Sequence, residues 1–249
     1  MGCGVPMTPN HPRRAKRQPA SNTPLSEEAL EAELTRALPS VMKLALAYAP
    51  KRHRLQTMAL FALDSRLANL LRHSREPMLA QLRLSWWRET LGREQAEWPQ
   101  GEPLLAALAL WSGHHRGLVA LVDGWEALTG PAPLAPENLR TMVEGRGQAF
   151  GALAEALGCE SDAETARAIG QDWALSDLAM RLGNPQEQES ARALATELAL
   201  TRVPRLPRPL RPLGVVRQLS ARRLAKGSED AAISPMALLG AMRVGLTGR

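Results

Sequence analysis

Apolar residues recur at intervals of three and four along most of the chain, and leucine and alanine dominate them. This spacing places apolar side chains on one face of an α-helix. Alanine and leucine favour helices, whereas the strand-favouring residues valine and isoleucine are scarce. The clearest case is the segment 51–74, which carries Leu55, Met58, Leu63, Leu67, Leu70 and Leu71. The pattern therefore predicts an all-α protein.

Prolines divide the pattern into separate segments, because proline interrupts helices and restricts the residue before it. Thr23 and Pro24 are the expected start of the first helix, and Pro39 and Pro50 delimit a short second one. Further helices are predicted near residues 51–74, 77–90, 103–114, 116–128, 136–157, 162–183, 187–200, 212–225 and 234–246. The 249 residues thus fit a disordered basic tail over 1–24 and one all-α domain of eight to ten helices over 25–249.

The net charge of +6 is distributed unevenly along the chain. Residues 1–24 hold four basic groups and no acid, and residues 202–226 hold eight and no acid. The long stretch between them is acidic, so the predicted domain lacks the basic, aromatic face of a nucleic-acid-binding protein. No nucleic-acid partner is expected. The basic segments either keep the protein in solution or contact anionic lipid or an acidic partner.

Short motifs add little to this prediction. The sequence has no phosphate-binding glycine loop and no nucleophile elbow, and Cys3 and Cys159 form no metal pattern. His114 and His115 are adjacent and are expected at the surface. Of the neighbouring Trp86 and Trp87, one is expected to pack inward and one to lie at a helix–helix seam. Without a secretory signal or a long apolar run, we expect a cytoplasmic protein, either free or peripheral to the inner membrane.

Three stretches of the chain resemble the squalene/phytoene synthase family, whose enzymes join two prenyl diphosphates head to head. The first runs from "YAPKRHR" to "SWWRE" over residues 48–89, and its lysine-arginine start and Trp-Trp-Arg ending are similar to two consecutive family helices. The others are "LRTMVEGRGQAFGAL" at 139–153 and "IGQDWALSDLAMRL" at 169–182. The resemblance implies an isoprenoid-synthase-like helical bundle around a deep apolar cavity.

The chain departs from the family at the metal ligands. The resemblance implies two Asp-rich motifs on facing helices, which hold Mg²⁺ and the substrate diphosphates. The acids of the first motif fall on Ala68, Asn69 and Arg72, and those of the second on Arg181 and near Pro185. Alanine cannot bind a metal ion and arginine repels one. We therefore expect no catalytic residues, no metal and no cofactor.

Some charged residues in these stretches are still candidates for substrate binding. Asp64 and Asp177 each lie one helical turn before a lost family acid, on about the same face. They form either a shifted two-carboxylate site or ion pairs inside the bundle with Arg66, Arg88 or Arg181. Arginines at the lost acid positions could instead bind a phosphate group without a metal ion. The predicted substrate-binding residues are Asp64, Arg72, Arg88, Asp177 and Arg181.

The resemblance and the missing acids together favour a non-catalytic protein. One branch of the family, the phytoene-synthase-like assembly factor of mitochondrial complex I, departs from the enzymes in a similar way, and this chain resembles a bacterial relative of it. That implies an interaction or assembly module at the membrane surface, with a respiratory-complex subunit or an anionic membrane as partner. The alternatives are an active Mg²⁺-dependent prenyltransferase of isoprenoid or carotenoid biosynthesis and a metal-independent protein that binds an isoprenoid ligand.

Overall fold

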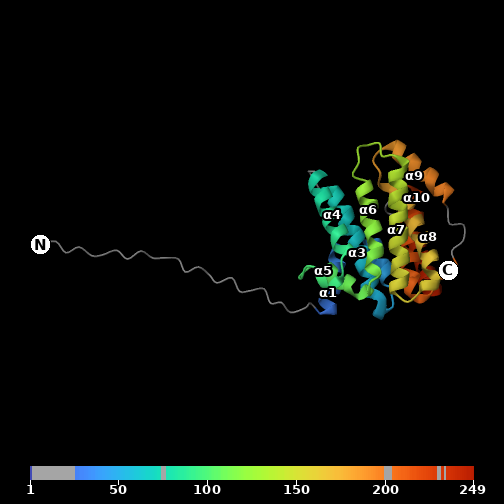
Figure 1. Cartoon of the computed structure of the whole chain (residues 1–249). Helices are drawn as coiled ribbons and strands as arrows, with labels where there is room; N and C mark the ends of the chain where they lie inside the picture. The colour runs from blue at the N-terminus through green and yellow to red at the C-terminus, as the bar shows by residue number, and fades with distance from the viewer. Residues whose placement is uncertain (2–25, 74–76, 199–203, 229–230, 233) are drawn as a thin grey trace.

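The computed structural model describes Met1 and residues 26–73, 77–198, 204–228, 231–232 and 234–249. All regular secondary structure in these residues is helical, which confirms the all-α prediction (Figure 1). Apart from Met1, the predicted tail over 1–24 lies outside the described residues, and so does the predicted helix start at Thr23 and Pro24.

Eleven α-helices occur in the described part of the chain, more than the eight to ten predicted. They are α1 (Glu27–Ala37), α2 (Ser40–Leu46), α3 (Lys51–His73), α4 (Pro77–Gly92), α5 (Pro103–Leu108), α6 (Val119–Ala127), α7 (Pro136–Ala156), α8 (Ala163–Arg181), α9 (Pro185–Glu197), α10 (Arg211–Lys226) and α11 (Pro235–Thr247). Short 3₁₀ turns join some of them, at Gln95–Glu97, Ala109–Trp111, His114–Leu118, Glu160–Asp162 and Arg208–Leu210.

Local chemistry accounts for several of the helix starts. Ser26 caps α1, since its hydroxyl accepts a hydrogen bond from the amide of Ala29. Proline occupies the first turn of α5, α7, α9 and α11, where its missing amide leaves no hydrogen bond broken. The helix expected over 103–114 ends early at Leu108 and continues as a 3₁₀ turn to Trp111, after which Ser112 and Gly113 adopt positive φ angles of 49° and 94°.

The long helices stand side by side in one bundle (Figure 1). Helix α7 packs against α6 on one side and α8 on the other and also contacts α3. Helix α10 packs against α8, α2 and the C-terminal helix α11. Helices α1 and α5 lie at one end of the bundle and α9 lies at the other (Figure 1). The arrangement places α7 and α8 at the centre, where they can present side chains to several neighbours.

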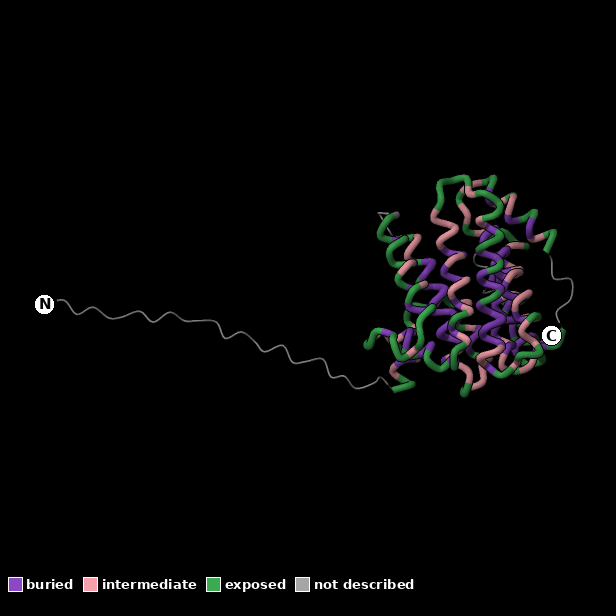
Figure 2. The backbone as a smooth tube through the Cα atoms, viewed as in Figure 1, coloured by how far each residue is buried: buried purple, intermediate pink, exposed green. Residues whose placement is uncertain are grey.

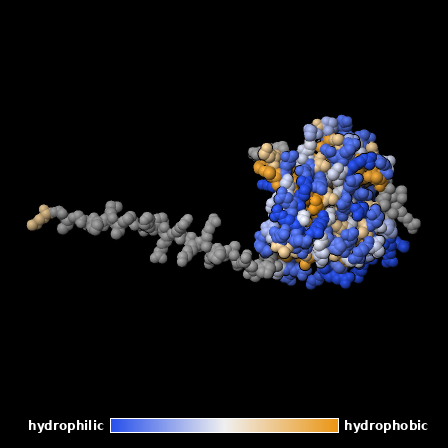
Figure 3. Space-filling model, in the orientation of Figure 1, coloured by the Kyte–Doolittle hydropathy of each residue, from blue (hydrophilic) through white to orange (hydrophobic). Residues whose placement is uncertain are grey.

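The buried residues follow this arrangement (Figure 2). The inner faces of α3, α7 and α8 are almost fully buried, and leucine and alanine supply most of the apolar core. Trp87 is buried as predicted for one member of its pair, but Trp86 lies at the surface with 41% of its area exposed. Its ring meets that of Trp87 edge to face at 4.9 Å. Figure 3 shows an apolar patch over the outer end of α4, where Met78, Leu79 and Leu82 are exposed.

Candidate functional site

A buried arginine on α7 joins three helices at the centre of the bundle. The Nε and Nη2 atoms of Arg146 donate hydrogen bonds to the two carboxylate oxygens of Asp64 on α3, at 3.0 and 3.1 Å. Its Nη1 atom donates to Oδ2 of Asp177 on α8 at 3.0 Å. All three side chains are at least 96% buried. A bidentate pair and a second carboxylate thus hold one guanidinium away from water.

Aromatic rings enclose this charged cluster. The indole nitrogen of Trp125 donates a hydrogen bond to Oδ1 of Asp64 at 3.0 Å. The guanidinium carbon of Arg146 lies 4.2 Å from the ring centroid of Trp173 and 5.2 Å from that of Trp125. Phe150 stacks on Trp173 with ring centroids 5.3 Å apart. The rings exclude water, which strengthens the hydrogen bonds between the charged groups.

Glycines on either side of Arg146 allow the neighbouring helices to approach it. A Cβ atom on Gly145 would lie 2.2 Å from the carbonyl oxygen of Ala120 on α6. A Cβ atom on Gly147 would lie 2.8 Å from the Gln171 side chain on α8, and one on Gly170 would lie 2.7 Å from the carbonyl oxygen of Arg146. The close contact of α7 with both neighbours therefore depends on residues without side chains. This contact explains why Arg146 is fully enclosed.

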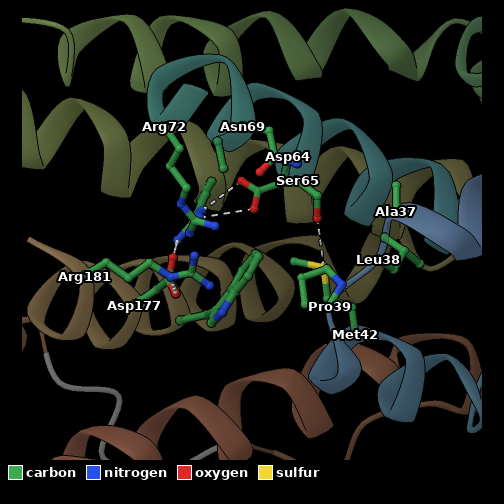
Figure 4. A pocket seen from close by; sticks show the side chains of 13 residues that line it. Ala37, Leu38, Pro39, Met42, Asp64, Ser65, Asn69, Arg72, Asp177 and Arg181 are labelled. Atoms are coloured by element: carbon green, nitrogen blue, oxygen red, sulfur yellow. Dashed lines mark hydrogen bonds and ion pairs between the residues drawn. The ribbon is translucent and has the colours of Figure 1, made fainter. Parts of the chain in front are cut away.

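A cavity of about 240 Å³ opens beside the cluster (Figure 4). Asp64, Asn69 and Arg72 line it from α3, and Asp177 and Arg181 line it from α8. Figure 4 shows the side chains of Arg72 and Arg181 extending from their helices into the space between α3 and α8. The Nε atom of Arg181 donates a hydrogen bond to Asp177 at 2.5 Å.

A second cavity of about 250 Å³ adjoins the first and shares Asp177 and Arg181 with it. Helix α10 closes this second cavity with Ser220 and Arg223, and Nη1 of Arg223 lies 3.7 Å from Oδ1 of Asp177. Ser220 is 1% exposed, and its hydroxyl has no hydrogen-bond partner among the described residues. It is a buried polar group that a ligand in this cavity could satisfy.

The two cavities carry a surplus of positive charge. Four arginines line them, Arg72, Arg146, Arg181 and Arg223, against the two carboxylates of Asp64 and Asp177. Arg72 is exposed and forms no ion pair within the described part of the chain. An excess of guanidinium groups around a hollow is the arrangement that binds phosphate or carboxylate anions.

The protonation of the cluster follows from its burial and its charges. Burial by itself lowers the pKa of Arg146, but the negative charges of Asp64 and Asp177 outweigh this and raise the pKa above its ordinary value. Burial raises the pKa of Asp177, and although the guanidinium of Arg146 opposes the rise, the charge of Asp64 adds to it. The guanidinium therefore stays protonated, and its charge offsets part of the cost of burying the Asp177 carboxylate.

Four of the five predicted substrate-binding residues meet at this site. Asp64, Arg72, Asp177 and Arg181 all line the first cavity. Arg88 does not, because it lies on α4 and pairs with Asp123 and Glu126 on α6.

Of the ion pairs expected for the two aspartates, only the one between Asp177 and Arg181 is present. Asp64 binds Arg146 instead, and Arg66 pairs with Glu102. Arg146 and Arg223 were not among the predicted site residues. The one signal for Arg146 is its position between two glycines in the middle of a long amphipathic segment.

Over the described residues, no group of three or more His, Cys, Asp or Glu side chains is placed to hold a metal ion. Within the same residues, no helix combines the length and the apolar character needed to cross a bilayer. Comparisons with protein-family models, with curated proteins and with solved structures find no match for this chain.

Proposed function

We propose that the protein is a non-catalytic relative of the squalene/phytoene synthases that acts by binding and not by prenyl transfer. The observation that carries this proposal is the contact of Arg146 with both Asp64 and Asp177. These two residues are the only acids among the described residues that line the two cavities. Both already accept hydrogen bonds from the same buried guanidinium.

The chemistry of prenyl transfer explains why this contact matters. Mg²⁺ needs several oxygen ligands, and in a prenyltransferase it offsets the charge of the diphosphate as that group leaves. A divalent ion between Asp64 and Asp177 would meet the positive charge of Arg146 at the same place. The guanidinium therefore occupies the place between the two carboxylates that a catalytic Mg²⁺ would need. This supports a protein that does not release pyrophosphate.

The packing beside the cluster supports the same proposal. Phe61, Phe150 and Trp173 form a buried aromatic group next to Arg146. The first cavity is smaller than the roughly 300 Å³ at the lower end of typical small-molecule sites. With the arginines that line it, this cavity suits a phosphate-sized group better than two prenyl chains.

The direct test of this proposal is a pyrophosphate-release assay with farnesyl and geranylgeranyl diphosphate, in Mg²⁺ and in Mn²⁺. We expect release at the rate of a protein-free blank. Metal-dependent release that Asp64→Asn and Asp177→Asn abolish, and that Asp123→Asn leaves unchanged, would overturn the proposal. Asp123 is the matched control because it is a half-exposed acid that pairs with Arg88 away from the cavities.

The partner we propose is a subunit of a respiratory complex, by the resemblance to the complex I assembly factor. Deletion of the gene is then expected to lower the amount of assembled complex I on native gels, while the transcripts of its subunits stay constant. Restoration by the wild-type gene is the control. An unchanged amount of assembled complex would refute this partner and leave the non-catalytic proposal in place.

A second candidate function is metal-independent binding of an anionic ligand, including the diphosphate end of an isoprenoid. The surplus of arginine over acid in the two cavities favours it, and so does the unpartnered hydroxyl of Ser220. Arg72 and Arg181 would contact the anion directly, because both point into the first cavity (Figure 4). A titration with inorganic pyrophosphate in EDTA tests this function separately from the assay for catalysis.

A further inference from the structure

The C-terminal helix α11 has an apolar face that no described part of the chain covers. Its inner face is made of small residues, Ala237, Ala241, Val244 and Gly245, and packs on the bundle. Its outer face exposes Met236, Leu239, Met242 and Leu246 by 59%, 58%, 48% and 64%. At 100° per residue, these four side chains lie on one side of the helix. We call them the α11 face.

Basic residues surround the C-terminal end of the α11 face. The Nε atom of Arg205 donates a hydrogen bond to the carbonyl of Thr247 at 3.1 Å, and Arg211 donates to that of Leu246 at 2.6 Å. Arg208 lies between Arg205 and Arg211 in the sequence and Arg249 follows Thr247, and both are exposed. Burial lowers the pKa of Arg211, and the positive charges of Arg205 and Arg208 lower it further. The cluster thus consists of like charges that an anion would stabilise.

Basic residues also occur at the N-terminal end of α11 and on the helix itself. Arg222 and Lys226 line a shallow hollow together with Met236. Arg243 is exposed between the apolar positions. The described residues from 204 onward hold nine basic side chains and no acid. Two of the nine, Arg217 and Arg223, pair with aspartates of α8. The remaining seven form the basic rim of the α11 face.

We propose that the α11 face and its basic rim dock the protein on an anionic membrane surface. A helix that lies in the plane of a bilayer inserts its apolar side chains below the headgroups, while arginines beside them contact phosphate. Long arginine side chains can reach the headgroup level from the edge of an inserted face. Within the described residues, the α11 face has both parts, an uncovered apolar row and a rim of basic side chains.

The charge of the rim also argues against a second copy of the chain as the occupant. A two-fold contact through the α11 face would bring identical rims of arginine together with no described acid between them. A bilayer with anionic headgroups complements both the apolar row and the charge. Membrane docking depends on α11, whereas the proposed function depends on the cavity between α3 and α8. Either proposal can therefore be refuted without affecting the other.

Flotation of the full chain with lipid vesicles at physiological salt tests the proposal. We expect binding to vesicles of phosphatidylcholine with phosphatidylglycerol and no binding to phosphatidylcholine alone. Leu239→Ser with Leu246→Ser should weaken binding by about tenfold or more, since both side chains would insert. The matched control is Met78→Ser with Leu82→Ser, which removes two exposed apolar side chains from α4 and should leave binding unchanged.

Charge reversal at the rim provides the second variant. Arg208→Glu with Arg243→Glu should weaken binding and reduce its dependence on salt, because both side chains are exposed and neither forms an ion pair among the described residues. The basic residues of segment 1–24 remain in every variant, so a loss of binding reports on α11. Absence of wild-type binding, or equal binding by the α11 and α4 variants, would overturn the proposal.

Discussion

Arg146 contacts both carboxylate oxygens of Asp64, at 3.0 and 3.1 Å, across 82 residues of sequence and with both side chains buried. The pair links α7 to α3, and the third hydrogen bond of the guanidinium links it to Asp177 on α8. A buried ion pair contributes little net stability compared with apolar packing, but losing one partner is costly. The cluster therefore fixes how the three helices meet.

Replacement of the buried arginine should destabilise the fold strongly. Arg146→Met leaves Asp64 and Asp177 without their shared partner, and we expect a loss of about 3–5 kcal/mol in the free energy of unfolding. Urea denaturation measures this loss. Arg140→Met, on the same helix but in a surface pair with Glu197, is the control and should leave the midpoint unchanged. An Arg146→Met variant as stable as wild type would contradict the structural role of the cluster.

Replacing all three charged residues of the cluster together distinguishes the contribution of ion pairing to stability from that of side-chain packing. Adding Asp64→Asn and Asp177→Asn to Arg146→Met removes the uncompensated carboxylates. The triple variant should therefore regain part of the lost stability. The same urea titration gives the coupling between the three positions. If the three losses simply added, the residues would not act as one unit.

Packing of α7 against α8 should be sensitive to a single methyl group. Gly170→Ala would place a Cβ atom 2.7 Å from the carbonyl oxygen of Arg146 and about as close to Phe150. We expect a loss of about 1–3 kcal/mol from overpacking, larger than the gain of about 1 kcal/mol in helix propensity. Gly92→Ala, where no atom lies within 4 Å, is the control and should not lose stability. Thermal denaturation compares the two.

We expect the folded protein to become less stable as the pH falls, because His115 is buried. This residue is buried against Trp98, with ring centroids 4.7 Å apart, although the sequence predicted it at the surface. Burial lowers its pKa, and its hydrogen bond to the carbonyl of Arg93 only partly opposes this. The unfolded chain takes up a proton near pH 6.5, whereas the folded one does so only near the lowered pKa. Stability is therefore lost as the pH falls from about 6.5 to that lowered pKa.

The measurement is the thermal midpoint between neutral pH and about pH 5. His115→Gln should reduce the decline in the midpoint over this range. His114→Gln, whose half-exposed side chain lies near Glu155, is the control and should follow the wild type. Equal pH profiles for wild type and His115→Gln would exclude this residue as the source.

Anion binding should depend on the arginines that line the first cavity. Arg72→Ala with Arg181→Ala is expected to lower the affinity for inorganic pyrophosphate by about tenfold or more, since two charge-assisted contacts are lost. Arg88→Ala is the control, because Arg88 pairs with acids on α6 and lies outside both cavities. Calorimetry measures the three affinities. An affinity that the double variant does not change would place the anion elsewhere.

The helical architecture was predictable from the sequence because its signals are local. Leucine spacing marks the helices, and prolines mark the starts of α5, α7 and α11 at Pro103, Pro136 and Pro235, whereas α9 begins at Pro185, two residues before its predicted start. The change from α-helix to 3₁₀ turn after Leu108, and the left-handed backbone of Ser112, were not predictable in this way, because the residue types there give no signal.

The site was predictable only in part. The family resemblance singled out Arg72 and Arg181 as positions of lost acids, and helical spacing placed Asp64 and Asp177 each one turn before such a position. The structure brings these four residues together around the first cavity. Arg146 was missed because its partners lie 82 and 31 residues away, and no local pattern reports contacts of that length.

The glycines on either side of Arg146 are the sequence feature that indicates its enclosure, and the predictions did not use it. Two glycines in the interior of a helix cost stability unless other helices approach closely there. Gly145 faces Ala120 on α6 and Gly147 faces Gln171 on α8, so the residue between them is enclosed.

We propose that Arg146, and not a metal ion, satisfies Asp64 and Asp177. Calorimetric titration of the protein with a non-hydrolysable farnesyl diphosphate analogue, once in Mg²⁺ and once in EDTA, measures this. We expect the same binding isotherm in both conditions. Binding that appears only in Mg²⁺, and that Asp64→Asn or Asp177→Asn removes, would contradict it.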